Sequence, residues 1–419
     1  SQDVRVRDMP SFMRSVSEVW QRINATPFLR QALSRYGSAV SVGLTSEIGI
    51  LPTRNWQTGV FEGEQGLLPK NFREKVVLKD LACPSCPIAC SKLCRGTDGS
   101  ISEGPEYETI YAFGSACGVG DIERVVQADM LCDKWGLDTI SAGVTIAFAM
   151  ECVQKGLLGS RQLQGIPIEF GRGEIFPALI RMMALREGIG DVLADGVEVA
   201  RRRLNIKDDS FAMHAKGMEL GGYDPRGLKG QALVFSTGPR GGCHHANGYV
   251  ITLEAASGKW DRFALAGKGE LVRQARNLRM IFDSAAYCAF AGIAGGLETA
   301  SLLLGPAIGQ TFDVPSLLRL GERCSNIERA YNVRQGVRRA QDTLPARLLN
   351  EPMPEGPSKG QVVELEPLLD DFYGVCGWDV QTGVPTKERL ESLDLHDIAV
   401  DLGSLLKGEV EGHRRPKEV

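Results

Sequence analysis

Several kinds of residue or pattern are scarce in this sequence, and each shortage excludes a class of protein. Aromatic residues make up 7% of the 419 residues, too few for the stacking surface of a protein that binds single-stranded nucleic acid. No basic block exceeds a few residues and the net charge is −4, whereas nucleic-acid-binding domains usually carry a basic stripe. The longest nearly apolar stretch, residues 142–153, is too short to span a bilayer. We therefore expect no nucleic-acid partner and no membrane span.

No signal-peptide pattern is visible, so we expect a cytoplasmic protein. In a reducing compartment the 11 cysteines would not form disulfides, and clustered cysteines indicate metal or redox chemistry. Glycine, by contrast, is abundant at 49 residues, which indicates many tight turns and close approaches of the backbone.

The spacing of apolar residues predicts a mainly α-helical fold. Asp121 begins a helix that ends at Gly136, and Asp138 caps the next helix. Further helices are expected over residues 12–23, 191–204, 270–286 and 315–338. Strand, loop or extended chain is expected over residues 39–66, 215–248 and from residue 344 onward. An acidic loop near residues 208–216 suggests two helical domains, 1–213 and 214–419.

Three cysteines within eight residues are the strongest motif. Cys83, Cys86 and Cys90 are spaced x2 and then x3, so their thiolates can bind one metal centre. A structural zinc site and a [4Fe–4S] cluster both need four ligands. The candidates for the fourth are Cys94, Cys243 and Cys288. Spacing alone leaves zinc and iron–sulfur both open.

Acidic and histidine motifs supply candidates for proton transfer. Glu103, Glu106 and Glu108 surround a Gly-Pro turn, which fits either a solvated loop or a carboxylate near a buried redox centre, where desolvation would raise its pKa. His244 and His245 follow a Gly-Gly pair and could be ligands, proton donors or core residues.

Two helix junctions carry similar acidic motifs. Capping alone explains Asp133 to Asp138, but its carboxylates and exposed amides could also hold the amino and ring N–H groups of a heterocycle. The segment from Asp283 to Cys288 has the same spacing, an Asp followed by four residues and a Cys.

These segments together resemble the aldehyde ferredoxin oxidoreductase family, tungsten enzymes with a bis-pterin cofactor and a [4Fe–4S] cluster. The matching stretches follow the family's order and cover nearly the whole chain. They are LPTRNW (51–56), CPSCPIAC (83–90), GPEYE (104–108), DKWGLDTIS (133–141), DPRG (224–227), RGGCH (240–244), DSAAYC (283–288) and EPMPEGP (351–357).

The resemblance implies a role for each motif. It implies that the four cluster ligands are Cys83, Cys86, Cys90 and Cys288. It assigns the first pterin to Asp133, Gly136, Leu137 and Asp138, and the second pterin to a junction that begins at Asp283. Glu108 and His244 match the carboxylate and imidazole beside the metal, which is tungsten or molybdenum, is held by pterin sulfurs and has no protein ligand.

The implied fold is that of domains 2 and 3 of the family, without the β-rich N-terminal domain that covers the pterin pair. The implied activity is oxidation of an aldehyde to its carboxylic acid, with electrons passing through the tungstopterin and the cluster to ferredoxin or an iron–sulfur partner subunit. The family is often dimeric, so a homodimer is a further expectation. Two alternatives stay open: a non-catalytic iron–sulfur or zinc electron-transfer module, and a tungsten subunit that reduces an aromatic acyl thioester.

Three departures from the family pattern bear on the site. Ala286 and Tyr287 stand where the second junction normally has Gly-Leu. Ala246 replaces a frequent Lys, which puts one pterin contact in doubt. The segment from Gln127 to Met130 lacks the Glu-x-x-His that bridges some dimers through a metal, so we expect no such bridge.

Overall fold

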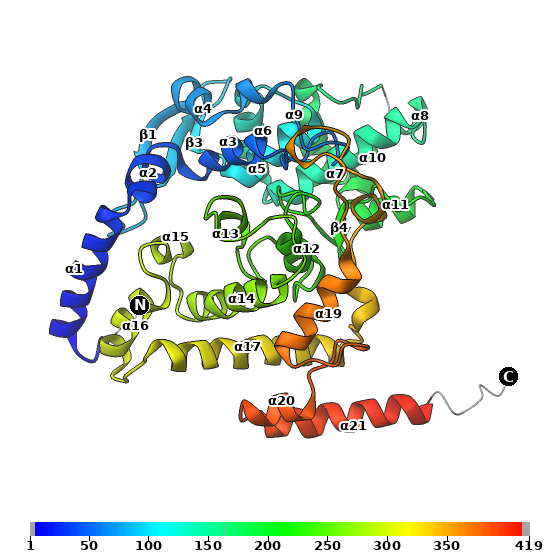
Figure 1. Ribbon diagram of the computed structural model, residues 1–419. Coiled ribbons are helices and arrows are strands. Elements are labelled where there is room, and N and C mark those ends of the chain that lie inside the picture. Colours follow the sequence, from blue (N-terminus) through cyan, green and yellow to red (C-terminus); the bar gives the residue numbers. More distant parts are fainter. Residues whose placement is uncertain (1–4, 164, 413–419) are drawn as a thin grey trace.

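The computed structural model describes residues 5–163 and 165–412, and it confirms the prediction of a mainly α-helical fold (Figure 1). The helices before the Gly-rich segment are α1 (Met9–Ala25), α2 (Ser34–Tyr36), α3 (Val40–Glu47), α4 (Pro69–Lys75), α5 (Tyr107–Phe113), α6 (Ile122–Trp135), α7 (Thr139–Gln154), α8 (Ser160–Leu163), α9 (Phe176–Leu185), α10 (Ile189–Leu193) and α11 (Val197–Arg203). The later helices are α12 (Lys229–Ser236), α13 (Ile251–Ala255), α14 (Lys268–Ser284), α15 (Ala289–Gly292), α16 (Gly296–Ile308), α17 (Val314–Arg334), α18 (Ala346–Asn350), α19 (Leu365–Cys376), α20 (Lys387–Ser392) and α21 (His396–Gly412).

Strands form two small antiparallel sheets among the described residues. The larger has the order β1-β2-β3 and comprises β1 (Val77–Leu81), β2 (Ser91–Arg95) and β3 (Ile101–Glu103). The smaller is a pair, β4 (His214–Ala215) and β5 (Met218–Glu219). The loop between β1 and β2 carries the three clustered cysteines, so the larger sheet fixes both ends of that loop.

The helix pair α6–α7 forms the central part of the core. Asp121 accepts a hydrogen bond from the Glu123 N–H (3.0 Å) at the start of α6, which confirms the predicted cap. Every residue from 142 to 152 is buried, so the longest apolar stretch of the sequence is a core helix. No single helix among the described residues is long and apolar enough to cross a membrane, and α6 and α7 pass that test only as a pair bent by 118°.

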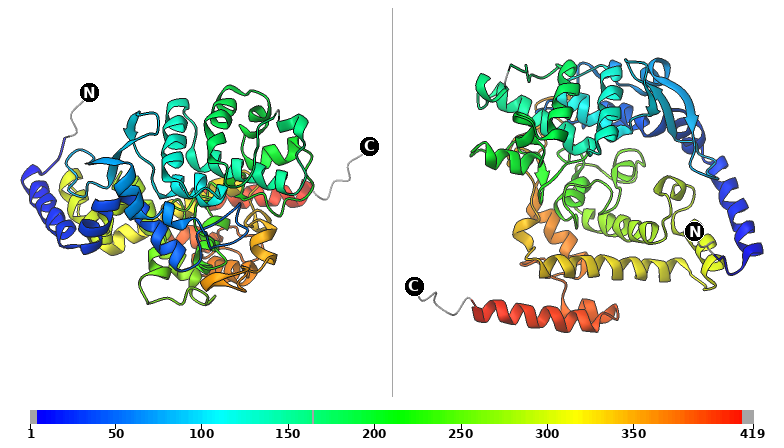
Figure 2. Two further views of the ribbon diagram at one scale, coloured as in Figure 1. Left: turned by 90° about the horizontal axis from the view of Figure 1, so that it is seen from above. Right: turned by 180° about the vertical axis from the view of Figure 1, so that it is seen from behind.

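The later helices build a second layer around α14. This helix packs along α17 and α19, and α12 also contacts it (Figure 1). At the edge of the molecule α1 lies against α16, and α20 and α21 pack on α17 through their own apolar cluster around Val333, Leu390 and Leu402 (Figure 2). The largest core cluster extends from Ala39 to Trp378 and so contains residues from most of the chain.

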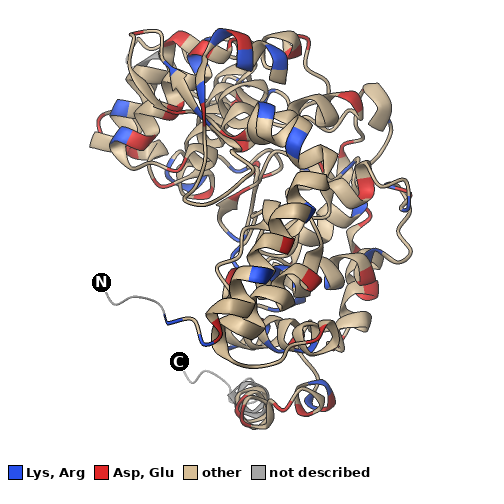
Figure 3. Ribbon diagram, turned by 90° about the vertical axis from the view of Figure 1, so that its left-hand side faces the viewer, with Lys and Arg blue, Asp and Glu red and all other residues tan. Residues whose placement is uncertain are grey.

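Charged residues of both signs are interspersed over the helices (Figure 3). Many are paired locally, as in the contact of Arg203 with Asp191 (2.5 Å) and that of Arg181 with Glu187 (2.5 Å). Exposed pairs of this kind contribute little to stability, with a typical value of about 0–1 kcal/mol each. They show instead that basic side chains of these helices face acidic neighbours.

Residues 40–47 correct the prediction of strand or loop for residues 39–66. They form α3, although Val40, Val42 and Thr45 are β-branched. Val42 and Thr45 are fully buried, and the Thr45 hydroxyl donates to the carbonyl of Ser41 (2.9 Å) one turn earlier. Tertiary packing therefore outweighs the weak local preference against a helix.

The tail and the Gly-rich segment also contain helices that were not expected. Four helices, α18 to α21, follow residue 344, and the proline-rich stretch 351–357 separates the first from the others. The Gly-rich region 215–248 contains α12, and the helix expected over 191–204 is broken at Gly196, where φ is +84°. Prolines and glycines end these helices, but they do not prevent new ones from starting.

Candidate active site

Glu108 lies in the first turn of α5, where the backbone turns from the extended Glu106 into the helix. Its Oε2 accepts a hydrogen bond from the Gly222 N–H (2.7 Å), which joins α5 to the Gly-rich segment. Its other oxygen, Oε1, is buried and accepts no hydrogen bond from the described residues. Burial raises the pKa of Glu108 to about 8, so this carboxyl group is mostly protonated at neutral pH.

His244 meets Glu108 from the other side. Its Nδ1 lies 3.3 Å from Glu108 Oε1, although the two atoms are not aligned as a hydrogen bond. A Cβ atom on Gly221 would lie 2.9 Å from the same Nδ1, so only glycine allows this close approach. Burial, with a smaller effect of the charges on His245 and two arginines, holds the pKa of His244 well below its usual range.

The Glu108–His244 contact therefore joins two neutral groups rather than an ion pair. The shift in each pKa has the same main cause, the loss of water around a charged form. A protonated carboxyl can donate its O–H to Nδ1, and this leaves the imidazole N–H on Nε2. The pair can thus present a hydrogen-bond donor while it holds a transferable proton.

Three tyrosines surround this pair. Tyr223 and Tyr249 approach each other through their hydroxyl groups (3.2 Å), and the ring of Tyr107 lies 4.9 Å from that of Tyr223. Tyr249 also stacks on His245 at 5.4 Å. Sequence reasoning missed Tyr223 and Tyr249 because no motif spacing links them to Glu108. Tyr107 lies inside the GPEYE motif and could have been noticed there.

An acid-lined cavity of about 330 Å³ opens beside Glu108. Its walls are Glu103, Gly104, Glu106, Glu108, Thr109, Asp129, Asp133, Asp138, Thr139 and Ile140. It therefore has six carboxyl groups and no lysine or arginine. Asp129 was not singled out in the sequence, and burial, together with the nearby charge of Asp133, raises its pKa to about 8. Such a lining fits a ligand rich in N–H donors.

The first junction supplies two of those walls through its turn. Gly136 adopts a left-handed conformation (φ 70°), and the Leu137 N–H bonds to the carbonyl of Cys132 (2.9 Å). This closing pattern is a Schellman turn, in which glycine avoids the steric cost of positive φ. Asp133 and Asp138 face the cavity, whereas Gly136 and Leu137 shape the turn and do not line it. Asp138 also caps α7 through its Oδ2.

The second junction repeats this turn. The Tyr287 N–H bonds to the carbonyl of Phe282 (2.8 Å), and Ala286 adopts positive φ (50°) where the first junction has glycine. Asp283 ends α14 half-exposed and pairs with Arg279 (2.9 Å). It does not line the acid-lined cavity, so the structure does not bring it together with the aspartates of the first junction.

The four predicted thiols lie on two facing segments. Cys83, Cys86 and Cys90 occupy the β1–β2 loop, and Cys288 precedes α15. Burial, followed by the charges of Glu106 and of the other three thiols, raises the pKa of Cys90 to about 11. The effect of Cys288, Cys86 and Cys83 on Cys90 places the four thiols near one another. Around them Ile88, with Phe290 and Ala291, belongs to a separate apolar cluster.

The other two candidates for the fourth ligand are engaged elsewhere. Cys94 is fully buried in the main core. Cys243 accepts hydrogen bonds from Arg240 (2.8 Å) and from two backbone N–H groups. In the described part of the chain, no group of three or more His, Cys, Asp or Glu side chains is arranged to hold a single metal ion.

Comparisons with known proteins identify the family of this chain. Residues 14–395 match the family model for aldehyde ferredoxin oxidoreductase, domains 2 and 3. The tungsten-containing aldehyde ferredoxin oxidoreductase of Thermococcus kodakarensis is 36% identical over 403 residues, which are 95% of this chain and 66% of that relative. The WOR-like subunit of an aliphatic sulfonate oxidoreductase from Pyrococcus furiosus is 28% identical, over 93% of this chain and 62% of the relative.

A solved structure shares the fold. It is the active-site complex BamBC of benzoyl-coenzyme A reductase, which aligns with a TM-score of 0.76 at 19% identity, over 96% of this chain and 67% of the other. Likeness at this identity concerns the fold alone. The matched family model, the curated relatives and the helical architecture agree, and the chain therefore belongs to the aldehyde ferredoxin oxidoreductase family, of which it comprises domains 2 and 3.

Proposed function

We propose that this chain forms part of a tungsten enzyme that oxidises aldehydes to carboxylic acids and passes the electrons to ferredoxin or an iron–sulfur subunit. The observation that carries the proposal is the buried contact of Glu108 with His244 beside the cavity that Asp133 and Asp138 line. The names of the relatives support the metal and the substrate class. Because the chain spans 66% of those relatives' length, the proposal concerns the whole enzyme.

The four thiols fit a [4Fe–4S] cluster. Such a cluster takes four cysteine thiolates, and the chain offers Cys83, Cys86 and Cys90 on one loop with Cys288 facing them. Cys86 and Cys90 are half-buried against apolar side chains, which limit water near these two ligands, whereas Cys83 and Cys288 are exposed. We also propose that the chain divides into domains 1–213 and 214–419, so that each domain contributes cluster ligands and one pterin junction.

The acid-lined cavity fits the polar edge of a pterin. Carboxylates accept hydrogen bonds from amino and ring N–H groups, and Asp133 and Asp138 present them from a rigid turn between two helices. Gly136 and Leu137 set that turn, and Asp283 occupies the equivalent place at the second junction. When bound, the tungstopterin supplies the two-electron chemistry and the cluster carries the electrons away.

Glu108 and His244 handle the proton and the substrate oxygen. Neutral His244 offers its Nε2–H to the carbonyl oxygen of the aldehyde, where a preorganised donor favours the developing negative charge. Glu108 acts as the general base once it has lost its own proton, and its Oε1 lies 3.3 Å from Nδ1 of the neutral His244. Contacts of this kind are often poorly aligned before substrate binds and shorten afterwards.

The proposal is tested by Glu108→Gln in the anaerobically prepared holoenzyme. We expect the variant to keep its tungsten and about four iron atoms per chain. Its rate of aldehyde-dependent viologen reduction should fall about 10²–10⁴-fold. Glu123→Gln, on the surface of α6, is the matched control and should leave turnover unchanged. Undiminished turnover in Glu108→Gln would exclude the proton role, and zinc without iron would exclude the cluster.

A further inference from the structure

One chain segment covers two of the four cluster thiols on the outer side of the molecule. It comprises the end of α1, the π-helical turn η1 (Phe28–Leu33) and α2, and it follows the left-hand edge of Figure 1. Buried apolar residues on its inner side pack with Ile88 of the cysteine loop, against Cys86 and Cys90. These residues are Val19, Ile23, Leu29 and Leu33. The segment therefore stands between these two thiols and the solvent.

A direct polar contact joins the segment to the cysteine loop. Arg30 of η1 donates a hydrogen bond to the carbonyl of Pro87, which lies between Cys86 and Cys90 in the sequence. Turns of π-helix such as η1 are rare and are found frequently at functional sites. The segment is thus positioned by the same loop that carries three of the four proposed cluster ligands.

The segment is basic, although the chain as a whole is acidic. Residues 9–36 contain four arginines and one glutamate, a net charge of +3, whereas the net charge of the whole chain is −4. Arg14, Arg30 and Arg35 form no ion pair with any described residue; they contact a hydroxyl group, a carbonyl and an aromatic ring, respectively. The fourth arginine is paired with two glutamates.

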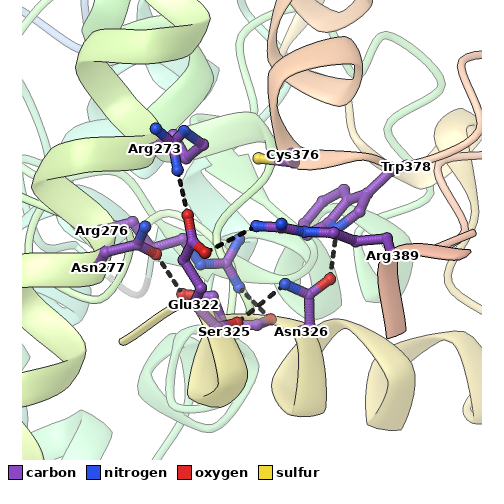
Figure 4. Close-up of a pocket in the computed structure, with 9 residues that line it drawn as sticks. All are labelled: Arg273, Arg276, Asn277, Glu322, Ser325, Asn326, Cys376, Trp378 and Arg389. Carbon is purple, nitrogen blue, oxygen red and sulfur yellow. Dashed lines mark hydrogen bonds and ion pairs between the residues drawn. The ribbon is translucent and has the colours of Figure 1, made fainter. Parts of the chain in front are cut away.

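Many arginines elsewhere in the molecule face carboxylates instead. In the small cavity between α14 and α17, Arg273 and Arg389 both contact Glu322 (Figure 4). Beside α10 and α11, Arg186 and Arg203 share a single aspartate in the same way. The unpaired arginines near the cysteine loop therefore give this part of the surface a positive potential, which attracts an acidic partner.

Exposed aromatic side chains accompany these arginines. Trp20 is 42% exposed and Phe28 is 39% exposed, although aromatic side chains are usually largely buried. Together with the exposed Arg30 and Arg35 they form what we call the α1–α2 patch. The core of a protein interface is enriched in aromatic residues and arginine, and electron-transfer encounters use small interfaces. The α1–α2 patch has this composition and is small.

We propose that the α1–α2 patch is the docking site of a small acidic iron–sulfur protein of the ferredoxin class, which takes electrons from the cluster. The inference rests on the function proposed above. Oxidation of one aldehyde with one water releases two electrons and two protons; the electrons reduce two [4Fe–4S] centres of the carrier in turn, and the protons pass to solvent. Docking here brings the carrier close to Cys86 and Cys90, because the same segment packs against both thiols.

Reduction kinetics of the holoenzyme test this docking site. An acidic ferredoxin with two [4Fe–4S] clusters is the protein acceptor, and benzyl viologen is the acceptor that needs no docking; benzaldehyde is the substrate in both assays. Arg35→Glu and Trp20→Ala should each raise the KM for ferredoxin about five- to tenfold. The kcat at saturating ferredoxin and the viologen rate should stay within about twofold of the unmodified enzyme. Arg202→Glu, at an exposed arginine of α11 on the opposite edge of Figure 1, is the matched control and should change none of these values.

Direct binding is a readout that does not depend on turnover. Calorimetric titration of the same ferredoxin into the holoenzyme at about 20 mM salt should give a dissociation constant that rises about five- to tenfold in Arg35→Glu and in Trp20→Ala. Raising the salt to about 200 mM should weaken binding to the unmodified enzyme about tenfold, because salt screens the charges of the two surfaces. Arg35→Glu should reduce this salt dependence.

The outcomes separate this inference from the proposed function. Normal ferredoxin binding without viologen reduction in the unmodified enzyme would overturn the aldehyde function alone. Normal viologen reduction, with an unchanged KM and dissociation constant for ferredoxin in both variants, would overturn the docking site alone. A dimer that Trp20→Ala dissociates in sedimentation would assign the patch to a second copy, and binding to phosphatidylglycerol vesicles that Arg35→Glu abolishes would assign it to a membrane surface; either result would also overturn the proposal.

Discussion

The proposed role of Glu108 as a general base predicts how turnover depends on pH. Burial raises the pKa of this carboxyl from 4.5 to about 8, and a general base must be deprotonated to act. Raising the pH therefore converts the inactive acid into the active base. His244 contributes no step in the same range, because its pKa is held well below 6.5 and it stays neutral.

The size of the effect follows from the pKa of about 8. About 1% of Glu108 is deprotonated at pH 6, about 10% at pH 7 and about 90% at pH 9. The value of kcat/KM for the aldehyde should therefore rise about tenfold from pH 6 to pH 7, almost tenfold again to pH 9, and then level off. An ordinary glutamate with a pKa near 4.3 would give no change over this range.

The assay is anaerobic reduction of a viologen dye by the holoenzyme at saturating dye, with kcat/KM measured at half-unit steps of pH. Asp129, whose pKa is also raised to about 8, could give a limb in the same place. Asp129→Asn separates the two, because it should retain the rising limb, whereas Glu108→Gln should give a low and flat profile. A flat profile in the unmodified enzyme, or a limb lost in Asp129→Asn, would refute the assignment to Glu108.

Three more predictions concern stability and the cluster. Folded Asp129 holds its proton up to about pH 8, whereas the unfolded carboxyl loses it near 3.8, so the free energy of unfolding should fall as the pH rises between these values. Asp129→Asn should remove about 1.4 kcal/mol of this loss per pH unit, measured by urea unfolding at pH 5, 6 and 7. Cys288→Ser should abolish the iron and sulfide content while Cys94→Ser, at a buried core thiol, leaves it intact; the opposite result would make Cys94 the ligand. Ala286→Gly should stabilise the fold by about 1 kcal/mol, because φ is +50° there and glycine avoids the steric cost of that conformation. Ala285→Gly, at a helical φ of −89°, should destabilise the fold by a similar amount in the same urea titration.

The predictable part of this fold is the part that local chemistry determines. Asp121, Gly136 and Asp138 set the ends of α6 and α7 through caps that depend on neighbouring residues only, and the structure has these ends as predicted. The helix α19 could also have been found, because Leu365, Leu368 and the residues that follow have helical spacing. The prolines between residues 352 and 357 instead favoured extended chain for the whole tail.

Other parts depend on distant contacts that spacing does not record. The α3 helix forms because Val42 and Thr45 are buried in the common core. The hydroxyl groups of Tyr223 and Tyr249 meet because the Gly-rich segment folds back over α5. The protonation state of Glu108 is of the same kind, since the motif identifies the residue but only its surroundings raise its pKa.

The two helix junctions show how one local turn yields two different sites. Both use the same closing hydrogen bond and the same left-handed position, so their backbone N–H groups and aspartates are presented alike. Their surroundings differ: Asp133 faces a cavity without any basic side chain, whereas Asp283 is half-exposed and paired with Arg279. If each junction holds one pterin, Asp133 can accept its N–H groups directly, but Asp283 must first share or release Arg279. The second junction should therefore bind its pterin more weakly, and Arg279→Gln should strengthen that binding while leaving the first junction unchanged.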